Sequence, residues 1–191
     1  PSSTLKLEVA PGASVDAAVA AANRATLVKL VPSQQASIET AYQAALSKVS
    51  DGAAKSAGIA VGEQAAAAIL ALRADDGAAG SESYRPYTTA GVYVPTTTPA
   101  VSQWPQRKPW VMTSPAQFRP GQTPALTSEV WERDYNEIKT LGGKNSARRT
   151  AEQTESALFW EASLPPIYHG IVRAVANISG RSVTQNARLL A

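Results

Sequence analysis

The side chains that most often carry catalysis are scarce in this sequence. It has one histidine, His169, and no cysteine. The single histidine excludes a metal site built from two or three histidines of this chain, and the lack of cysteine excludes a zinc–thiolate site, an iron–sulfur cluster and a cysteine nucleophile. A Ser–His–Asp triad would have to use His169, which lies between Ile167 and Ile171 in a predicted helix. We therefore expect a structural role for His169.

Neighbouring carboxylates are the next candidates, because a pair of them can act as general acid and base. Asp75 and Asp76 stand directly before Gly77, a pattern typical of a helix end followed by a turn. Glu129 and Glu132 lie in the first turn of another predicted helix, where they compensate the helix dipole. Neither group therefore predicts a catalytic pair. The glycine-rich phosphate loop and the Gly-x-Ser-x-Gly elbow are absent from the sequence.

Two basic clusters could bind anions. Arg148–Arg149 precedes Thr150, a predicted helix cap, so the pair could hold an anion at a helix N-terminus; the alternative is a solvated loop. The segment from Trp104 to Trp110 includes Arg107 and Lys108 and could stack on single-stranded nucleic acid. It is one short cluster in a chain of net charge +3 whose basic residues are scattered, so we expect no nucleic-acid partner.

The composition indicates which kind of fold must position such groups. The chain has 191 residues, of which 44% are hydrophobic and 17% charged, and it contains 36 alanines. This length and hydrophobic content are enough to bury a core, and the alanine content favours helices with close, small-residue interfaces. No apolar run reaches the roughly 18 residues of a membrane span, so we expect none.

Residues 11–76 form an alanine-rich block with the spacing of three helices. Ser14 is placed to cap the first helix, which Pro32 stops, while Ser33 and Asp51 are placed to cap the second and third. The second helix carries the clearest amphipathic stripe, which we expect to face the core. Its members are Ile38, Ala41, Tyr42, Ala45, Leu46 and Val49.

The third helix of this block, which we expect to end near Arg73, is rich in small residues. Gly58 and Gly62 share one face, which predicts a buried packing helix that neighbours can approach closely. The alternative interpretation, a Gly-x-x-x-Gly dimer motif in a membrane, is excluded because Lys55 and Glu63 interrupt the segment.

Residues 77–125 are rich in proline and aromatic residues. Eight of the 13 prolines lie here, with Trp104, Trp110 and Phe118. A disordered linker is poor in aromatic residues, so we expect a long, ordered loop that wraps over the helical body. Either its aromatic side chains fill surface grooves, or the loop forms one wall of an active-site entrance.

Residues 126–191 are predicted to be helical again. The expected helix starts share capping residues or prolines: Thr127 or Ser128, the Thr150–Gln153 capping box, Pro165–Pro166, and Ser182. The whole pattern predicts an all-α fold, a helical bundle with one long, ordered, Pro-rich loop. We expect residues 1–191 to form a single, partial helical domain.

The order of these segments resembles the vanadium-dependent haloperoxidases and their relatives in the type-2 phosphatidic acid phosphatase superfamily. The resemblance runs from about Pro11 to Ala191 and covers the N-terminal and middle part of the family. The segments that carry it are the Gly58/Gly62 helix ending in Ala71–Gly77, then Trp104–Pro105, Phe118–Gly121, Glu137–Lys139, Leu141–Gly142, Arg149–Thr154 and Phe159–Trp160.

The resemblance implies a helical-bundle enzyme that binds vanadate, or phosphate in the phosphatases, through Lys, Arg, Ser-Gly backbone and His. None of the family's three ligand motifs is present. Seven positions before Arg119–Pro120 stands Met112 rather than lysine, and Ala78 takes that place before Arg85–Pro86. Ser179–Gly180 is followed by arginine rather than histidine. We therefore expect no catalytic, cofactor-binding or metal-binding residue of the family in this chain.

From the resemblance we expect this chain to be the incomplete, scaffold half of a larger enzyme. Vanadate is then the implied cofactor, with ligands outside the chain. The implied partner is a C-terminal catalytic half or a second chain, a homo-oligomer is an open possibility, and a secreted or periplasmic location is favoured. The alternative function is a non-catalytic helical binding or assembly module.

The resemblance also places the Pro-rich block near the entrance to the family's anion site. Five residues of the block are candidates for the wall of that entrance: Trp104, Arg107, Trp110, Phe118 and Arg119.

Overall fold

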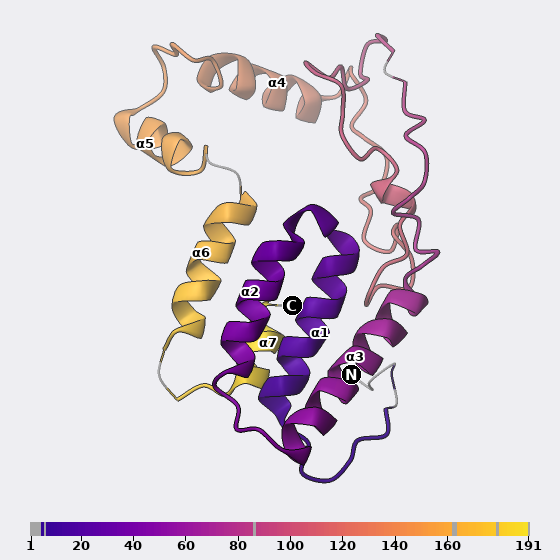
Figure 1. Ribbon diagram of the computed structural model, residues 1–191. Coiled ribbons are helices and arrows are strands. Elements are labelled where there is room, and N and C mark those ends of the chain that lie inside the picture. The colour runs from indigo at the N-terminus through magenta and orange to yellow at the C-terminus, as the bar shows by residue number, and fades with distance from the viewer. Residues whose placement is uncertain (1–4, 6, 86, 162–163, 179, 191) are drawn as a thin grey trace. The chain divides into compact units, whose positions relative to one another are not determined.

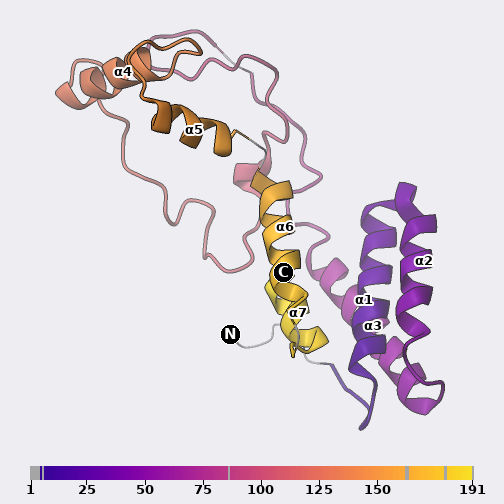
Figure 2. The same ribbon diagram turned by 90° about the vertical axis from the view of Figure 1, so that its left-hand side faces the viewer.

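The computed structural model describes residues 5, 7–85, 87–161, 164–178 and 180–190. Within these ranges every regular element is a helix and no strand occurs, which confirms the predicted all-α fold (Figures 1 and 2). Pro86 and Ser179, which belong to two sequence comparisons made above, lie outside the described residues, as does Ala191.

The chain divides into two compact units. Unit 1 comprises Pro1–Ala74 and Pro165–Ala191, and unit 2 comprises Asp75–Leu164. The predicted Pro-rich block therefore falls in unit 2, and the alanine-rich block falls almost entirely in unit 1. The expectation of one partial domain over 1–191 stays a prediction, and each unit is described by itself.

The first helices of unit 1 form a hairpin. α1 (Val15–Leu30) begins as predicted at Ser14, whose hydroxyl accepts a hydrogen bond from the backbone N–H of Ala17 at 3.2 Å. η1 (Pro32–Gln34) then leads into α2 (Gln35–Leu46). The predicted cap at Ser33 is wrong, because Pro32 opens a 3₁₀ turn that includes Ser33 and moves the start of α2 to Gln35.

α3 (Ala53–Leu72) packs against α1, so that α1 lies between α2 and α3 (Figure 1). Gly58 and Gly62 are buried in this contact, which confirms the predicted packing helix. A Cβ added at Gly62 would fall on the carbonyl oxygen of Ala18 and lie 2.9 Å from the Cβ of Ala21. The close approach of the two backbones therefore requires glycine at this position.

The start of α3 differs from the prediction in one detail. Gly52 is the residue before the helix and provides no side-chain cap. Asp51 instead forms an ion pair with Lys55, with 2.8 Å between its Oδ1 and the lysine Nζ. The predicted capping role of Asp51 is therefore wrong, since the lysine one turn later takes its carboxylate.

Unit 1 is completed by α6 (Leu164–Ala176), whose first residue is counted with unit 2, and α7 (Val183–Leu190). α7 packs against α1. Ser182 starts α7 as predicted: its hydroxyl accepts from the Gln185 N–H at 3.3 Å, and its own N–H donates to the Gln185 side chain at 2.8 Å. The buried apolar side chains of unit 1 are small apart from one leucine: Ala17, Ala21, Leu46 and Ala66.

Unit 2 holds the long loop and two helices. η2 (Trp104–Gln106) is the one helical turn within the described part of the Pro-rich block. α4 (Glu129–Leu141) starts at Ser128, whose hydroxyl accepts from the Trp131 N–H at 3.2 Å, and α5 (Ala151–Phe159) starts with the predicted Thr150–Gln153 capping box. Whether the loop wraps the helices of unit 1 stays a prediction.

Candidate functional site

A buried polar cluster of unit 2 is built around Asp76, which is 4% exposed. Its Oδ2 accepts hydrogen bonds from Arg107, at 3.0 Å from Nε and 2.9 Å from Nη2, and its Oδ1 accepts from the Ala78 N–H at 2.9 Å. The backbone oxygen of Asp76 accepts from the Lys108 N–H at 2.7 Å. A buried carboxylate needs such partners, because desolvation of an unpaired charge is very costly.

The rest of this cluster closes a shorter loop within the Pro-rich block, residues 77–106. The Arg107 guanidinium lies over the Trp104 ring, 4.3 Å from its centroid, and Gln103 donates to the Ala78 carbonyl at 3.1 Å. Gly77, with φ of 89°, makes the turn that lets the chain pass this close to Arg107. The cluster therefore joins two segments about thirty residues apart in the sequence and fixes the two ends of the shorter loop formed by residues 77–106.

Of the five candidate wall residues, the structure brings Trp104 and Arg107 together. Trp110 is 67% exposed and Phe118 is 76% exposed. Within the described residues, no hydrogen bond, ion pair or ring contact joins Phe118 or Arg119 to the Asp76 cluster. The charge of Arg107 is matched by Asp76, so the cluster holds the loop rather than presenting an unpaired cation. The role of the five residues as an entrance wall stays a prediction.

Arg149 forms a second clamp in unit 2. Its Nη1 donates to the carbonyls of Leu141 at 2.8 Å and Gly143 at 3.0 Å, its Nη2 to Lys144 at 3.2 Å, and its Nε to the Thr154 hydroxyl at 3.0 Å. These carbonyls belong to the C-terminal end of α4 and the turn after it, where a helix leaves acceptors unsatisfied. Arg149 thus ties α4 to α5.

This geometry decides between the two alternatives weighed for Arg148–Arg149. Arg149 does not offer its donors to an anion, because protein oxygens accept its hydrogen bonds. The pair lies in a largely exposed loop, in which Arg149 is half-buried. Arg148 is exposed. The sequence of the dipeptide alone does not predict these bonds, because the four acceptors come from the end of α4, the turn after it and α5.

The remaining candidates are not assembled into a site. His169 is exposed on α6, and Glu129 and Glu132 are exposed in the first turn of α4. Within the described ranges, no group of three or more His, Asp or Glu side chains is placed to hold a metal ion.

A hollow of about 530 Å³ lies between α1 and α2 in unit 1. Its walls are mostly apolar, with Val19 and Leu27 from α1 facing Ile38 and Tyr42 from α2. Val183, the first residue of α7, also lines it. We call this hollow the α1–α2 groove. Its size is within the range of small-molecule and peptide sites.

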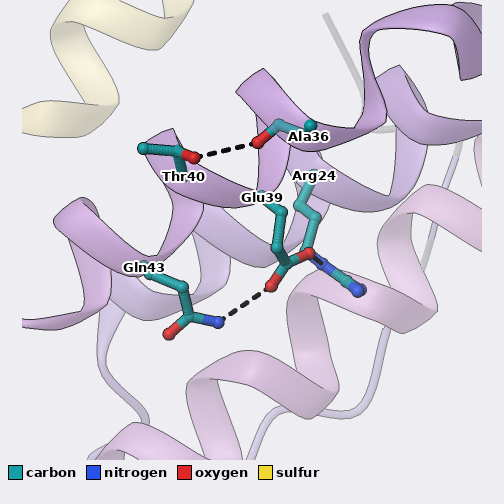
Figure 3. A network of polar contacts seen from close by, with 5 residues as sticks. All are labelled: Arg24, Ala36, Glu39, Thr40 and Gln43. Carbon is teal, nitrogen blue, oxygen red and sulfur yellow. Dashed lines mark hydrogen bonds and ion pairs between the residues drawn. The ribbon is translucent and has the colours of Figure 1, made fainter.

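A polar network joins the two helices beside the groove (Figure 3). Arg24 Nε lies 2.6 Å from Glu39 Oε2, and Glu39 Oε1 accepts from Gln43 at 2.8 Å. The Arg24 guanidinium also lies over the Tyr42 ring, 5.1 Å from its centroid. The hydrogen bond from Arg24 holds the pKa of Glu39 below its usual value, and the same bond raises the pKa of Arg24.

Comparison with known proteins found no relative of this chain: no family model, no curated protein and no solved structure matches it. No described helix is both long enough and apolar enough to cross a membrane.

Proposed function

We propose that this chain is the helical scaffold part of a vanadium-dependent haloperoxidase-like enzyme, or of a related acid phosphatase-like enzyme, whose anion ligands lie outside it. The observation that carries the proposal is the large surface that the chain leaves exposed. It exposes 15125 Å², whereas a compact monomer of 20.0 kDa is expected to expose about 8700 Å².

The difference between the two areas is about 6400 Å². An interface between two domains of one chain buries about 600–1500 Å², which would remove only a fraction of it. Much of the exposed surface in unit 2 is aromatic or aliphatic, a composition that favours burial against further protein. The most exposed of these side chains are Tyr87, Tyr93, Trp110, Val111, Phe118, Ile138, Leu158 and Phe159.

The class of enzyme rests on the resemblance of ordered segments. Binding of vanadate or phosphate requires several converging donors and positive charges. In unit 2, Arg107 and Arg149 already donate to protein oxygens, so the converging set is expected from residues that pack against this chain. The proposed role of the chain is to position them.

The test is to sequence the source gene beyond the codon for Ala191 and to express the complete reading frame. We expect a segment with Pro-Ser-Gly-His, and a product that oxidises bromide with peroxide, or hydrolyses phosphate esters, in a vanadate-sensitive way. The 191-residue chain alone should show no turnover. A stop codon directly after Ala191, or vanadate-dependent turnover by the chain alone, would refute the proposal.

A second readout is independent of activity. The four tryptophans all lie in unit 2, between Trp104 and Trp160, and each is at least 36% exposed. We expect acrylamide to quench their fluorescence strongly in the 191-residue chain and weakly in the complete product. Equal quenching in both would show that unit 2 is not covered by the rest of the protein.

The alternative function is a non-catalytic helical binding or assembly module. The commitment of Arg107 and Arg149 to protein oxygens favours it, because neither of these two guanidinium groups is directed at an anion. In that case the complete product should protect the tryptophans in the quenching experiment and yet show neither vanadate-dependent turnover nor phosphate-ester hydrolysis.

A further inference from the structure

α4 carries an apolar face that no other helix of unit 2 covers. Trp131, Tyr135 and Ile138 follow one another at spacings of four and three residues, which places them on one side of the helix. Their exposed fractions are 36%, 49% and 70%. Among the described elements of unit 2 no helix packs along α4, and Arg149 reaches only its C-terminal end. We call these three side chains the α4 face.

Most of the α4 face is ordered before any partner binds. The rings of Trp131 and Tyr135 are stacked, with 5.0 Å between their centroids and 9° between their planes. The Lys139 ammonium group lies 6.0 Å from the centroid of the Tyr135 ring. Aromatic side chains that are already held in place lose little conformational entropy when a second surface covers them.

The charges along one edge of the α4 face differ between its two ends. Glu132 directly follows Trp131 in the sequence, and Lys139 directly follows Ile138, so both flank the same edge two turns apart. Neither has an ion-pair partner among the described residues. This edge is therefore acidic near the start of α4 and basic near its end.

An edge of this kind is complementary to itself. In the heptad pattern of paired helices, Trp131, Tyr135 and Ile138 take positions d, a and d, and Glu132 and Lys139 both take position e. When two such helices lie antiparallel with Tyr135 of each copy opposite Ile138 of the other, the e positions face each other. Glu132 of each copy then meets Lys139 of the other, so the pair contains two symmetric ionic contacts.

The alternative arrangements of two α4 helices lack this match. In the same antiparallel register Trp131 lies opposite Gly142, which is exposed and has no side chain to obstruct the ring. A shift by one heptad would place Glu132 against Glu132, or Lys139 against Lys139. A parallel pair would offer Lys139 only Asp134, whose carboxylate lies 2.8 Å from its own neighbouring arginine, and would align the two helix dipoles unfavourably.

From these observations we propose that the α4 face binds the α4 face of a second copy of this chain, antiparallel, with Glu132 of each copy against Lys139 of the other. Three partly exposed side chains per copy supply less area than the roughly 1,200 Å² of a standard interface, so the pair is weak and reversible. The inference goes beyond the proposed function, because it concerns one face of α4 and holds for an enzyme or a binding module.

Sedimentation velocity of the 191-residue chain, from the low to the high micromolar range, tests the contact. We expect a concentration-dependent equilibrium between monomer and dimer. Ile138→Glu places a charge in the apolar contact and should raise the dissociation constant of the dimer about tenfold or more. Thr140→Glu is the matched control, because it adds the same charge at an exposed position on the opposite side of α4 and should leave the constant unchanged. Circular dichroism of both variants must match the original chain.

Charge exchange tests the register. Glu132→Lys and Lys139→Glu should each weaken the dimer several-fold, because like charges then face each other. The double variant should regain the original affinity, and an equal mixture of the two single variants should associate more tightly than either variant alone. In a parallel pair position 139 faces Asp134 instead, so the double variant would remain weakened.

Several results would overturn the proposal. The first is a chain that stays monomeric over the whole range, and the second is a dimer that Ile138→Glu and Thr140→Glu weaken equally. A double charge variant that remains as weak as the single variants would also exclude the antiparallel register. If the complete product of the reading frame is monomeric at the same concentrations, the α4 face does not bind a second copy in the whole protein. The proposed function is measured separately, as turnover by that product.

Discussion

Small side chains are buried in unit 1, whereas unit 2 exposes its large aromatic side chains and buries an aspartate. The buried apolar residues of unit 1 are Ala17, Ala21, Leu46 and Ala66, on three helices that lie side by side. Among the described residues of unit 2, Asp76 is the buried side chain, while Phe118 is 76% exposed.

The two units are therefore stabilised in different ways. Alanine and glycine allow backbones to approach closely, so the helices of unit 1 gain packing contacts from each other. Unit 2 is fixed instead by arginine clamps: Arg107 closes the loop formed by residues 77–106, and Arg149 holds the end of α4. Its aromatic residues have no comparable cover within the unit.

The largest expected effect is at the α1–α3 contact of unit 1. Gly62→Val would force a side chain against the Ala18 carbonyl and the Ala21 Cβ, so we expect the free energy of unfolding to fall by about 3 kcal/mol. Urea denaturation followed by circular dichroism measures this. Gly121→Val is the control in unit 2, because a Cβ there meets no atom within 4 Å. Equal stability of the two variants would contradict the packing of α3 on α1.

The next effect concerns the buried residue of the α2 stripe. Leu46→Ala should reduce the free energy of unfolding by about 2 kcal/mol, near the lower end for buried leucines, because α2 is covered on one side only. The same urea experiment measures it. A change below about 0.5 kcal/mol, which is typical of surface substitutions, would place Leu46 in solvent.

The third effect concerns the ion pair between Asp76 and Arg107 in unit 2. Asp76→Asn keeps an oxygen for the Ala78 N–H but removes the charge that holds Arg107, so we expect the free energy of unfolding to fall by about 1.5 kcal/mol. The measurement is the rate of limited trypsin cleavage after Arg107, which should rise because the base of the loop opens. Asp75→Asn, at an exposed neighbour, is the control. Cleavage at equal rates in the two variants would show that the clamp does not hold the loop.

Local signals in the sequence predict most of unit 1 and the helix starts of unit 2. Ser14, Ser128 and the Thr150–Gln153 pair cap helices as expected, because capping depends on residues within one turn. The two wrong caps, Ser33 and Asp51, have local competitors: the proline that opens η1 and the lysine that pairs with Asp51.

Local signals in the sequence do not predict the two arginine clamps or the α1–α2 groove. Asp76 and Arg107 are separated by about thirty residues, and neither has a periodic pattern that points to the other. Arg149 is visible in the sequence as a cation, but the carbonyls that it caps depend on how the chain turns after α4. Periodicity identifies the apolar face of α2, but it does not specify which element covers that face.

The smallest expected effect is the pH dependence of the Arg24–Glu39 pair in unit 1. Because Arg24 lowers the pKa of Glu39 in the folded state, the pair stabilises the fold at pH values above the unfolded-state pKa of the carboxyl. This contribution is lost as the pH falls through the lower, folded-state pKa.

Both side chains are more than one-third exposed, so water and salt screen the interaction and the effect is small. We expect Glu39→Gln to be slightly less stable than the original chain at pH 7, and this deficit to be smaller near pH 3, because the carboxyl becomes protonated as the pH falls toward its lowered, folded-state pKa. Urea midpoints at the two pH values measure the difference, and Glu155→Gln, an exposed position in unit 2, is the control. If the deficit of Glu39→Gln is the same at both pH values, then the ionised carboxylate of Glu39 does not stabilise the hairpin of α1 and α2.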